Sequence, residues 1–357
     1  MPPAESRVLQ SARPVLEING QEEAQLTEML LEMLIVENVQ GLYRCELKLS
    51  NWGALGETTG FQHLDRSKID FGHALKVKPQ GDDTVVFNGR VMAFEADYPQ
   101  GESPAITLLA EDRLQDLRMT RRTRSFEDTT DADLFSQVAR DHSLRDDIQL
   151  DGPTHRVLAQ VNQSDLAFLR ERARLLEVEL WIEDDTLHAC PRSARGAETV
   201  RLSYGGSLHS FTVQADLAAQ RTSVKVHGWD VSAKQTVSHA ADKSSVSSEL
   251  SGNKSGADIL EEKLGARIEA LVHTVPFSQE EARSYAEGYF RTMARRFVTG
   301  SGATDFDSRL RVGNLVELEA LGPMFSGSYY ICEVRHVFSQ ASGFRTHFSV
   351  ERSFISD

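Results

Sequence analysis

Apolar and polar residues alternate through the first third of the chain, with the period of two that is typical of strands buried on one face. In Leu42–Leu49 the apolar positions fall at every second residue: Tyr43, Cys45, Leu47 and Leu49. Three further stretches predict strands separated by turn-rich sequence: Ala74–Val77, Val85–Ala96 and Ile106–Ala110. We expect one short helix at Glu22–Leu34. Several short strands joined by turns predict a small barrel or sandwich that ends near residue 112.

The pattern becomes helical between residues 113 and 198. Thr130 and Asp133 have the spacing of a capping box, and apolar residues follow them at helical intervals. A second helix is expected to begin near Ser164, and a hairpin after it to turn at Asp184-Asp185. This segment therefore predicts a compact α/β module between two β regions.

Strand-like alternation returns in the rest of the chain, where residues 208–231 and 315–354 are expected to form one β domain. Between them, Val237–Gly256 is rich in serine and poor in apolar residues, which predicts a flexible loop or linker. Two helices should follow, so that residues 234–302 form an insertion in this domain.

Apolar residues at helical spacing mark the first of these two helices: Leu260, Leu264, Ile268 and Leu271. The second helix opens with a capping box from Ser278 to Glu281 and is expected to end at Gly300.

The predicted fold class is therefore α+β and mainly β, in three domains: residues 1–112, 113–198 and 199–357. No short sequence repeat is evident. The two β domains are nevertheless similar in size and could be structurally related.

Composition excludes several classes of function. The chain has 357 residues, enough for two or three domains, and a formal net charge of −14. A general affinity for nucleic acid or anionic lipid is not expected, because phosphate binding needs a positive face. The cysteines Cys45, Cys190 and Cys332 have no C-x-x-C spacing, which argues against structural zinc and against a disulfide scaffold.

The chain carries no sign of signal-peptide export or membrane insertion. Met1–Gln10 lacks the charged-then-apolar order of a secretory signal, and no apolar run approaches the length of a membrane span. We expect synthesis and assembly in the bacterial cytoplasm, with later release by another route left open.

Three stretches resemble catalytic or phosphate-binding motifs but lack an essential residue. Gly205–His209 begins like a nucleophile elbow, but His209 replaces the second glycine, so a loop entering a strand is the simpler interpretation. A glycine-rich stretch lacks the Gly-Lys-Ser/Thr of a P-loop and predicts a surface loop; its glycines are Gly53, Gly56 and Gly60. The adjacent acids Glu183, Asp184 and Asp185 are typical of a solvated turn.

Histidines and arginines give no site either. The histidines lack helical H-x-x-x-H spacing, and His336 and His347 fall in predicted strands, where packing or a satisfied hydrogen bond is the usual role. The one basic run is interpreted as a solvated face or as arginines that pair with acids of a neighbouring subunit: Arg113, Arg118, Arg121, Arg122 and Arg124. We predict no catalytic residue, no cofactor site and no metal site.

Three groups of residues, taken in order, resemble one family. The first is Asn162–Arg170 followed by Leu180–Leu187, a polar lead, a helix and a strand-turn-strand. The second is Leu310–Val316, leading through Phe325–Tyr330 to Val334–His336, and the third is Val86–Val91 with Ala110–Arg113 after it. This ordered set resembles the late control D-type hub proteins of phage tails and the hub portion of VgrG-type spikes.

The resemblance implies two tube-like β-barrel domains, an α/β module between them and a homotrimer whose six barrels form a pseudo-six-fold ring. Such a hub would join a hexameric inner tube to a trimeric spike within the baseplate of a contractile injection system or phage tail, without catalysing a reaction. VgrG-type proteins continue into a small barrel and a needle, whereas this sequence ends at Asp357. The spike is therefore expected to be a separate polypeptide, and other baseplate proteins are expected partners.

Two other functions stay open from sequence. A tail-associated cell-wall hydrolase would need a positioned acid in a cleft, and no candidate pair is evident. A monomeric ligand-binding barrel would remain a single copy inside the assembled particle.

Overall fold

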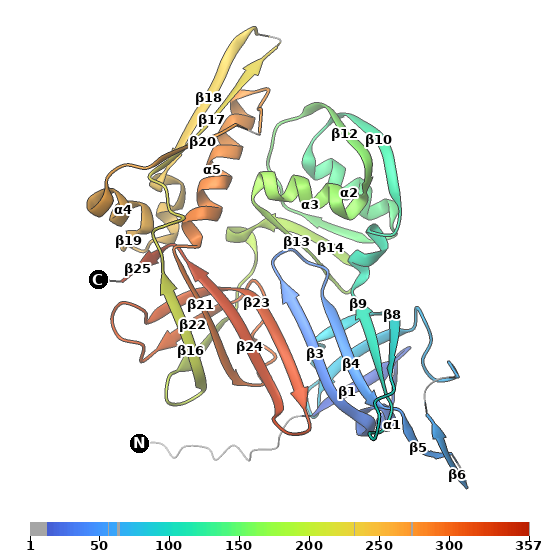
Figure 1. The fold of residues 1–357 in the computed structure, drawn as a ribbon. Helices are drawn as coiled ribbons and strands as arrows, with labels where there is room; N and C mark the ends of the chain where they lie inside the picture. Colours follow the sequence, from blue (N-terminus) through green and yellow to red (C-terminus); the bar gives the residue numbers. More distant parts are fainter. Residues whose placement is uncertain (1–12, 56, 63–64, 232, 273, 357) are drawn as a thin grey trace.

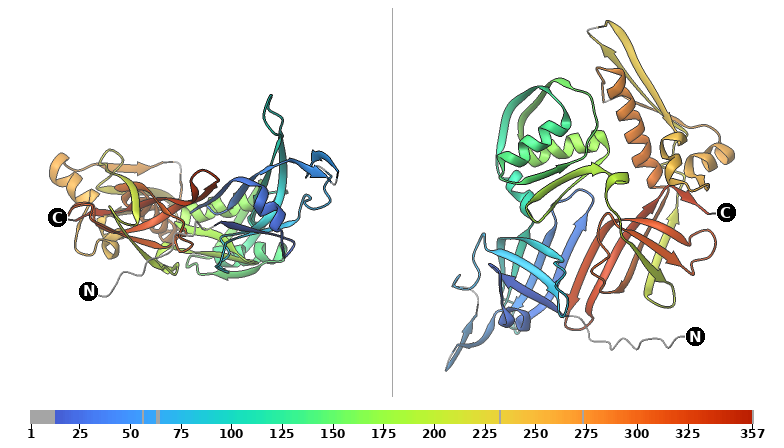
Figure 2. Two further views of the ribbon diagram at one scale, coloured as in Figure 1. Left: turned by 90° about the horizontal axis from the view of Figure 1, so that it is seen from below. Right: turned by 180° about the vertical axis from the view of Figure 1, so that it is seen from behind.

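The computed structural model describes residues 13–55, 57–62, 65–231, 233–272 and 274–356. The chain is mainly β, as predicted, and its dominant feature is a sheet of thirteen strands (Figure 1). An α/β module and a smaller sheet with a long helix lie against one end of this large sheet (Figures 1 and 2). Within the described residues, no helix is long and apolar enough to cross a membrane.

The strands predicted in the first third are confirmed. They are β4 (Arg44–Ser50), β7 (Ala74–Pro79), β8 (Phe87–Asp97) and β9 (Ala105–Glu111). The apolar face of β4 is buried as expected, with Cys45, Leu47 and Leu49 fully covered. The other elements of this region are β1 (Pro14–Ile18), β2 (Gln21–Glu22), β5 (Trp52–Leu55) and β6 (Thr58–Phe61).

The helix expected at Glu22–Leu34 is wrong over most of its length. Only Ala24–Met29 is helical (α1), and Leu30–Asn38 forms strand β3. Strand β3 pairs with β4 on one side and with a strand from the far end of the chain on the other. These long-range pairings override a local pattern that suits either structure.

The middle module follows the prediction closely. It contains η1 (Arg113–Leu117), β10 (Arg121–Thr129), α2 (Asp131–Asp141), β11 (Arg145–Ile148), β12 (His155–Ser164), α3 (Asp165–Leu176), β13 (Val178–Glu183), β14 (Thr186–Pro191) and η2 (Arg192–Ala194). Thr130 and Asp133 form the reciprocal capping box, and Ser164 caps α3 through the backbone N–H of Ala167. The hairpin between β13 and β14 turns at Asp184-Asp185 as expected.

The last region contains more regular structure than predicted. Its strands are β15 (Thr199–Ser203), β16 (Leu208–Ala215), β17 (Ser223–Asp230), β18 (Gln235–Asp242), β19 (Lys254–Ser255), β20 (Ile268–Leu271), β21 (Val298–Asp305), β22 (Leu315–Glu319), β23 (Gly327–Ser339), β24 (Gly343–Arg352) and β25 (Phe354–Ile355). Its helices are η3 (Lys243–Glu249), α4 (Gly256–Leu264) and α5 (Gln279–Arg295).

The prediction of a flexible loop or linker at Val237–Gly256 is wrong. Strand β18 continues to Asp242 and pairs with β17 along its whole length, and η3 follows it. Ala241 and Val246 belong to the core cluster that contains residues of α5, and Val237 is buried as well. Strand pairing and a few buried apolar residues thus order this serine-rich segment.

Two further expectations in this region are corrected. The first helix stops at Leu264, and Ile268–Leu271 instead forms β20, which pairs in parallel with β17. Strand β17 also lies outside the large sheet, although residues 208–231 were expected to share a β domain with residues 315–354.

The long helix α5 begins as predicted but does not end at Gly300. Ser278 accepts a hydrogen bond from the Glu281 backbone N–H, but the Glu281 side chain turns to Phe277 and His155 instead of completing a capping box. Gly300 lies within β21, where the Phe211 ring packs on the backbone; a Cβ atom there would lie 2.5 Å from Phe211 Cζ. The glycine allows this close approach of a ring.

Strand β23 joins the two ends of the chain in one sheet. Its first residues, Gly327–Tyr330, pair with Leu318–Leu315 of β22. Its later residues, Glu333–Ser339, pair with Asn38–Glu32 of β3. Strand β24 covers its other edge. Among the described residues the strand order runs from β16 to β2 without returning on itself, so no closed barrel is present.

Four hydrophobic cores lie beside these sheets. The first core is made of buried residues between Leu16 and Ala110, together with Phe338 and Phe344. The second belongs to the α/β module. The third is made of buried residues between Val200 and Val350, and the fourth lies between α5 and the β17–β18 hairpin. Phe338 and Phe344 extend from the C-terminal strands into the N-terminal core, which ties the two regions together. The exact domain boundaries stay a prediction.

Replacing Phe348 with aspartate should unfold the chain. Phe348 is 2% exposed on β24, and an unpaired carboxylate there should cost more than about 4 kcal/mol. The matched control is His347→Asp, because His347 is exposed on the opposite face of the same strand. Soluble yield and thermal unfolding should separate the two variants, and a normally folded Phe348→Asp protein would contradict the assigned core.

A polar groove as the candidate functional site

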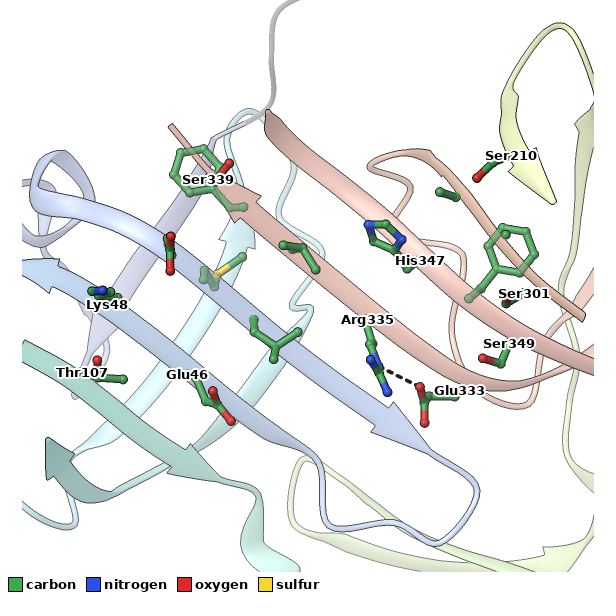
Figure 3. A pocket seen from close by; sticks show the side chains of 18 of the residues that line it. Glu46, Lys48, Thr107, Ser210, Ser301, Glu333, Arg335, Ser339, His347 and Ser349 are labelled. Atoms are coloured by element: carbon green, nitrogen blue, oxygen red, sulfur yellow. Dashed lines mark ion pairs between the residues drawn. The ribbon is translucent and has the colours of Figure 1, made fainter. Parts of the chain in front are cut away.

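A groove of about 990 Å³ runs across one face of the large sheet (Figure 3). Eight consecutive strands line it, in the order β16, β21, β24, β23, β3, β4, β9 and β8. The opposite faces of these strands carry the buried cores, as Leu47, Leu108 and Val334 illustrate. The groove is therefore the solvent face of a sheet whose other face is dry.

The lining of the groove is polar and carries a net negative charge. Its carboxylates are Glu32, Glu46, Glu95 and Glu333, its cations are Lys48 and Arg335, and His347, Thr107 and several serines complete it. Arg335 Nε lies 2.8 Å from Glu333 Oε1, and Figure 3 shows this ion pair between side chains of one strand. The labelled side chains are spread across the sheet and do not converge on one point (Figure 3). A face whose polar groups are spread out in this way suits contact with a large polar partner. Catalysis on a small substrate would need groups that converge on one point.

The groove is built from an internal repeat. We call β3, β4, β9 and β8 the N-terminal half-sheet, and β16, β21, β24 and β23 the C-terminal half-sheet. One cross-strand row in the N-terminal half-sheet is Glu32, Lys48, Thr107 and Glu95. The matching row in the C-terminal half-sheet is Ser210, Ala303, His347 and Arg335, which stand in the same register.

Irregularities in the pairing repeat as well. The register shifts after Leu30 in β3 and after Leu208 in β16, at equivalent positions. It shifts again between Val91 and Ala93 in β8, and between Ile331 and Glu333 in β23. The two halves are thus related in structure, as their similar size suggested, although equivalent groove residues differ in type.

The elbow-like stretch does not form a catalytic pair. Ser207 Oγ accepts a hydrogen bond from the Ser203 backbone N–H at 3.2 Å, and the Ser207 carbonyl accepts one from Thr304. His209 lies beside Asp305 instead, with 3.5 Å between Nε2 and Oδ2. The stretch is a turn leading into β16.

The other candidate motifs occupy structural positions. Gly53 and Gly60 face each other in the β5–β6 hairpin, while Gly56 lies outside the described residues. At the tip of the β13–β14 hairpin, Asp185 binds Arg113 at 2.7 Å. His336 is fully buried, with Nδ1 3.0 Å from Thr346 Oγ1, and burial lowers its pKa to about 3, so it stays neutral. His347 lies exposed in the groove.

Arginines of the basic run pair within the chain. Arg122 and Arg124 both reach the buried carboxylate of Asp165, and Arg118 pairs with Glu111. Arg121 donates to the carbonyl of Asn162. These contacts organise the α/β module, and the described residues hold no group of three or more His, Cys, Asp or Glu that could bind a metal ion.

A buried ionic cluster, which sequence patterns did not reveal, joins the module to α5. His155 lies between two carboxylates, with Nε2 2.9 Å from Asp131 and Nδ1 3.1 Å from Glu281. Arg172 binds both oxygens of Asp131. Hydrogen bonds to the two acids raise the pKa of His155 to about 9, so the ring is protonated at neutral pH. Both ring nitrogens are occupied, so the cluster holds structure and has no free base.

A second cluster joins the module to the large sheet. Glu179 of β13 accepts hydrogen bonds from Arg195 at 2.7 Å and from the Tyr330 hydroxyl at 2.5 Å. The guanidinium of Arg192 stacks 3.8 Å above the Tyr330 ring and also pairs with Glu351 of β24. Removing one member would leave the others charged and buried, so the cluster fixes the position of the module.

The His155 cluster predicts a pH-dependent stability. Because the folded-state pKa of His155 is raised, its contribution is full below pH 6.5 and is lost as the pH rises through 9. The pKa values of Asp131 and Glu281 are lowered, so their contribution disappears in acid. His155→Gln should therefore cost up to about 3 kcal/mol near pH 6 and much less near pH 9.

Urea unfolding of wild type and His155→Gln at several pH values measures this difference. His188→Gln is the control, since the His188 ring hydrogen-bonds the exposed Asp147 and stacks on Trp181, and neither contact belongs to the buried cluster. A constant gap between wild type and His155→Gln across the range would contradict the assigned protonation.

A sequence-family model described as the Alg8 N-terminal domain matches residues 18–340. No curated protein matches the chain by sequence.

Several solved structures share the fold over nearly the whole chain. A 43 kDa tail protein of prophage MuSo2 from Shewanella oneidensis superposes with a TM-score of 0.69 at 14% identity, over 96% of this chain and 98% of that one. A tail protein from Neisseria meningitidis MC58 gives 0.67 at 11% identity, over 96% of both chains. The Escherichia coli c3393 protein gives 0.60 at 11% identity, over 94% of this chain and 76% of that one. That protein is described as a type VI secretion component similar to the T4 tail proteins gp27 and gp5.

Proposed function

We propose that this chain, which belongs to the Alg8 N-terminal domain family, is a non-enzymatic baseplate hub that connects the inner tube of a contractile injection system or phage tail to its spike. The hub would be a homotrimer of the late control D and VgrG-hub kind. Its partners would be a hexameric tube ring, a trimeric spike and other baseplate proteins.

The observation that carries the proposal is the polar groove across both half-sheets. The wall of a water-filled tube needs one face that packs on a hydrophobic core and one face that is exposed to solvent. The large sheet has this polarity over eight adjacent strands. Three copies arranged around an axis would place three such grooves on the inside. The repeat within each groove would then give six similar wall segments, which matches a six-fold tube while keeping a three-fold face for the spike.

The fold supports this reading independently of the groove. The solved structures that superpose along the chain are tail proteins or a secretion-system component. In the proposed architecture, each half-sheet with its core corresponds to one tube-like domain, with residues 113–198 as the module between them. The buried clusters at His155 and Glu179 would make the module a rigid part of the hub.

The groove position can be tested by cysteine labelling. Thr107→Cys lies in the groove, and Ser238→Cys lies exposed on β18, away from it. A maleimide on a bulky polymer should label both variants in the free chain. In isolated particles it should label Ser238→Cys many times faster than Thr107→Cys, while a small maleimide still reaches both. Equal labelling by the bulky reagent in particles would contradict an inward-facing groove.

A cell-wall turnover assay tests the absence of enzyme activity. The groove side chains lie spread over several strands, so purified chain should release no more soluble peptidoglycan fragments than a heat-unfolded sample. Substituting Glu32, Glu46 and Glu95 by glutamine removes three groove carboxylates at once. Robust turnover that these substitutions abolish would replace the structural role with a hydrolase.

A further inference from the structure

A second cleft lies where the α/β module approaches α5 and the large sheet (Figure 1). Its volume is about 1020 Å³. Residues of α3 and β13 form one wall, α5 and the residues after it form another, and residues of β23 and β24 complete the lining. Glu333 and Ser349 line both this cleft and the groove, so the two adjoin. We call it the α3–α5 cleft.

Three arginines of the α3–α5 cleft lack an acidic partner. Arg170 and Arg174 stand one turn apart on α3, and Arg296 follows directly after the last residue of α5. None of the three forms an ion pair with a carboxylate of the residues that the structure describes. Like charges one turn apart on a helix also repel each other. The cleft therefore presents positive charge that its surroundings do not neutralise.

The acids of the cleft do not offset these arginines, because most of them are already paired. The paired acids are Glu177 with Arg295, Glu179 with Arg195, Glu333 with Arg335, and Glu351 with Arg192. Glu171 is outside any ion pair among the described residues and accepts a hydrogen bond from Gln163. In a chain with a net charge of −14, the α3–α5 cleft is thus a local excess of positive charge.

Arg170 has the most to gain from an added anion. Its side chain is partly buried, and it donates to the carbonyls of Gln40 and Gly41 at 3.0 Å each. These carbonyl oxygens accept its N–H groups but do not cancel its charge. Burial lowers the pKa of Arg170, and nearby like charges lower it further, against the opposing attraction of Asp112. A carboxylate that entered the cleft would offset this cost through charge-assisted hydrogen bonds.

Besides its charges, the cleft carries an apolar and aromatic surface. The residues that form it are Val39, Leu175, Val178, Leu271, Tyr285 and Tyr289. Tyr289 is still 39% exposed, although its hydroxyl donates to Glu269. An inorganic anion would leave this surface uncovered, whereas a peptide with apolar side chains between its carboxylates would cover it.

We propose that the α3–α5 cleft binds a short acidic segment of a partner protein. Carboxylates of the segment would pair with Arg170, Arg174 and Arg296, and an apolar side chain between them would pack against Tyr289. The arginines stand on two walls, which suits carboxylates spaced along a peptide better than a single phosphate group. This binding function goes beyond the hub function and does not depend on it. Within a hub, the partner would be a protein that lies along the adjoining groove.

The two walls of the cleft are already fixed relative to each other. Glu177 follows the last residue of α3 and pairs with Arg291 and Arg295 of α5. These contacts join the walls without using any of the three unpaired arginines. The cleft is therefore formed before a segment enters it, which lowers the entropic cost of binding.

Peptide binding to the purified full-length chain tests the proposal. The probe is a short dye-labelled peptide of alternating glutamate and leucine, and its fluorescence anisotropy reports binding. Wild type should bind it, and added salt should weaken the binding, because Arg174 and Arg296 are exposed. The double variant Arg174→Glu with Arg296→Glu should bind about tenfold more weakly or worse, since each substitution replaces an attraction by a repulsion.

Two matched controls separate charge from apolar contact. Arg156→Glu makes the same charge change at an exposed position of β12 outside the cleft, and its affinity should stay within about twofold of wild type. A peptide of alternating glutamate and serine keeps the charge of the probe and removes its apolar side chains. It should bind wild type clearly more weakly than the glutamate–leucine peptide does.

The opposite results would overturn the proposal. It fails if the glutamate–leucine peptide does not bind, or if it binds the double variant as tightly as wild type. Equal binding of the two peptides would remove the apolar contact from the recognition. Inorganic phosphate or a short duplex DNA that binds at the same arginines, when the peptide does not, would replace the peptide by a phosphate ligand. All of these measurements use the isolated chain, so they are separate from the labelling of particles that tests the hub.

Discussion

One strand holds the architecture together. One edge of strand β23 pairs with β22 along its first part and with β3 along its second part. This edge joins two half-sheets from opposite ends of the chain into one continuous surface. Each half-sheet alone would expose a row of unpaired backbone groups at this point. The contact also places Phe338 in the N-terminal core, so hydrogen bonding and apolar burial favour the same arrangement. The groove exists only because this junction is continuous.

Two buried ionic clusters hold the α/β module to the rest of the chain, in addition to apolar contacts across the boundary such as those of Leu42 and Trp181. Where α3 and β12 approach α5, His155, Asp131 and Glu281 lie buried together, and where β13 approaches β24, Glu179 and its arginines do the same. Removing such groups from water is costly, and the cost is recovered only when every partner is in place. Buried ionic contacts of this kind allow little movement of the module relative to the sheet, because each charged group must stay with its partner. An apolar interface allows more. Such ionic contacts are suited to a part whose orientation relative to the sheet must be fixed.

Local sequence signals predicted much of this structure, and long-range contacts account for the failures. Alternation located β4, β7, β8 and β9, and caps at Thr130 and Ser164 located α2 and α3. Leu30–Asn38 was misassigned because its apolar residues suit a helix as well as a strand buried between two partners. Ile268–Leu271 was misassigned for a similar reason, since pairing with β17 decides its conformation. A serine-rich composition concealed the few apolar residues that order β18 and η3.

The groove could not be predicted because its lining has no distinctive residue type. Equivalent positions such as Glu32 and Ser210, or Thr107 and His347, share a location and a polarity but no chemical identity. A solvent-exposed sheet face requires only that its residues be polar, whereas the buried face must keep its volume and its register. The repeat is therefore visible in the strand pairing and in the position of the bulges, and is lost in the residues themselves. A surface of this kind is the expected result when the function belongs to the shape of the sheet, since no single side chain then has to be kept.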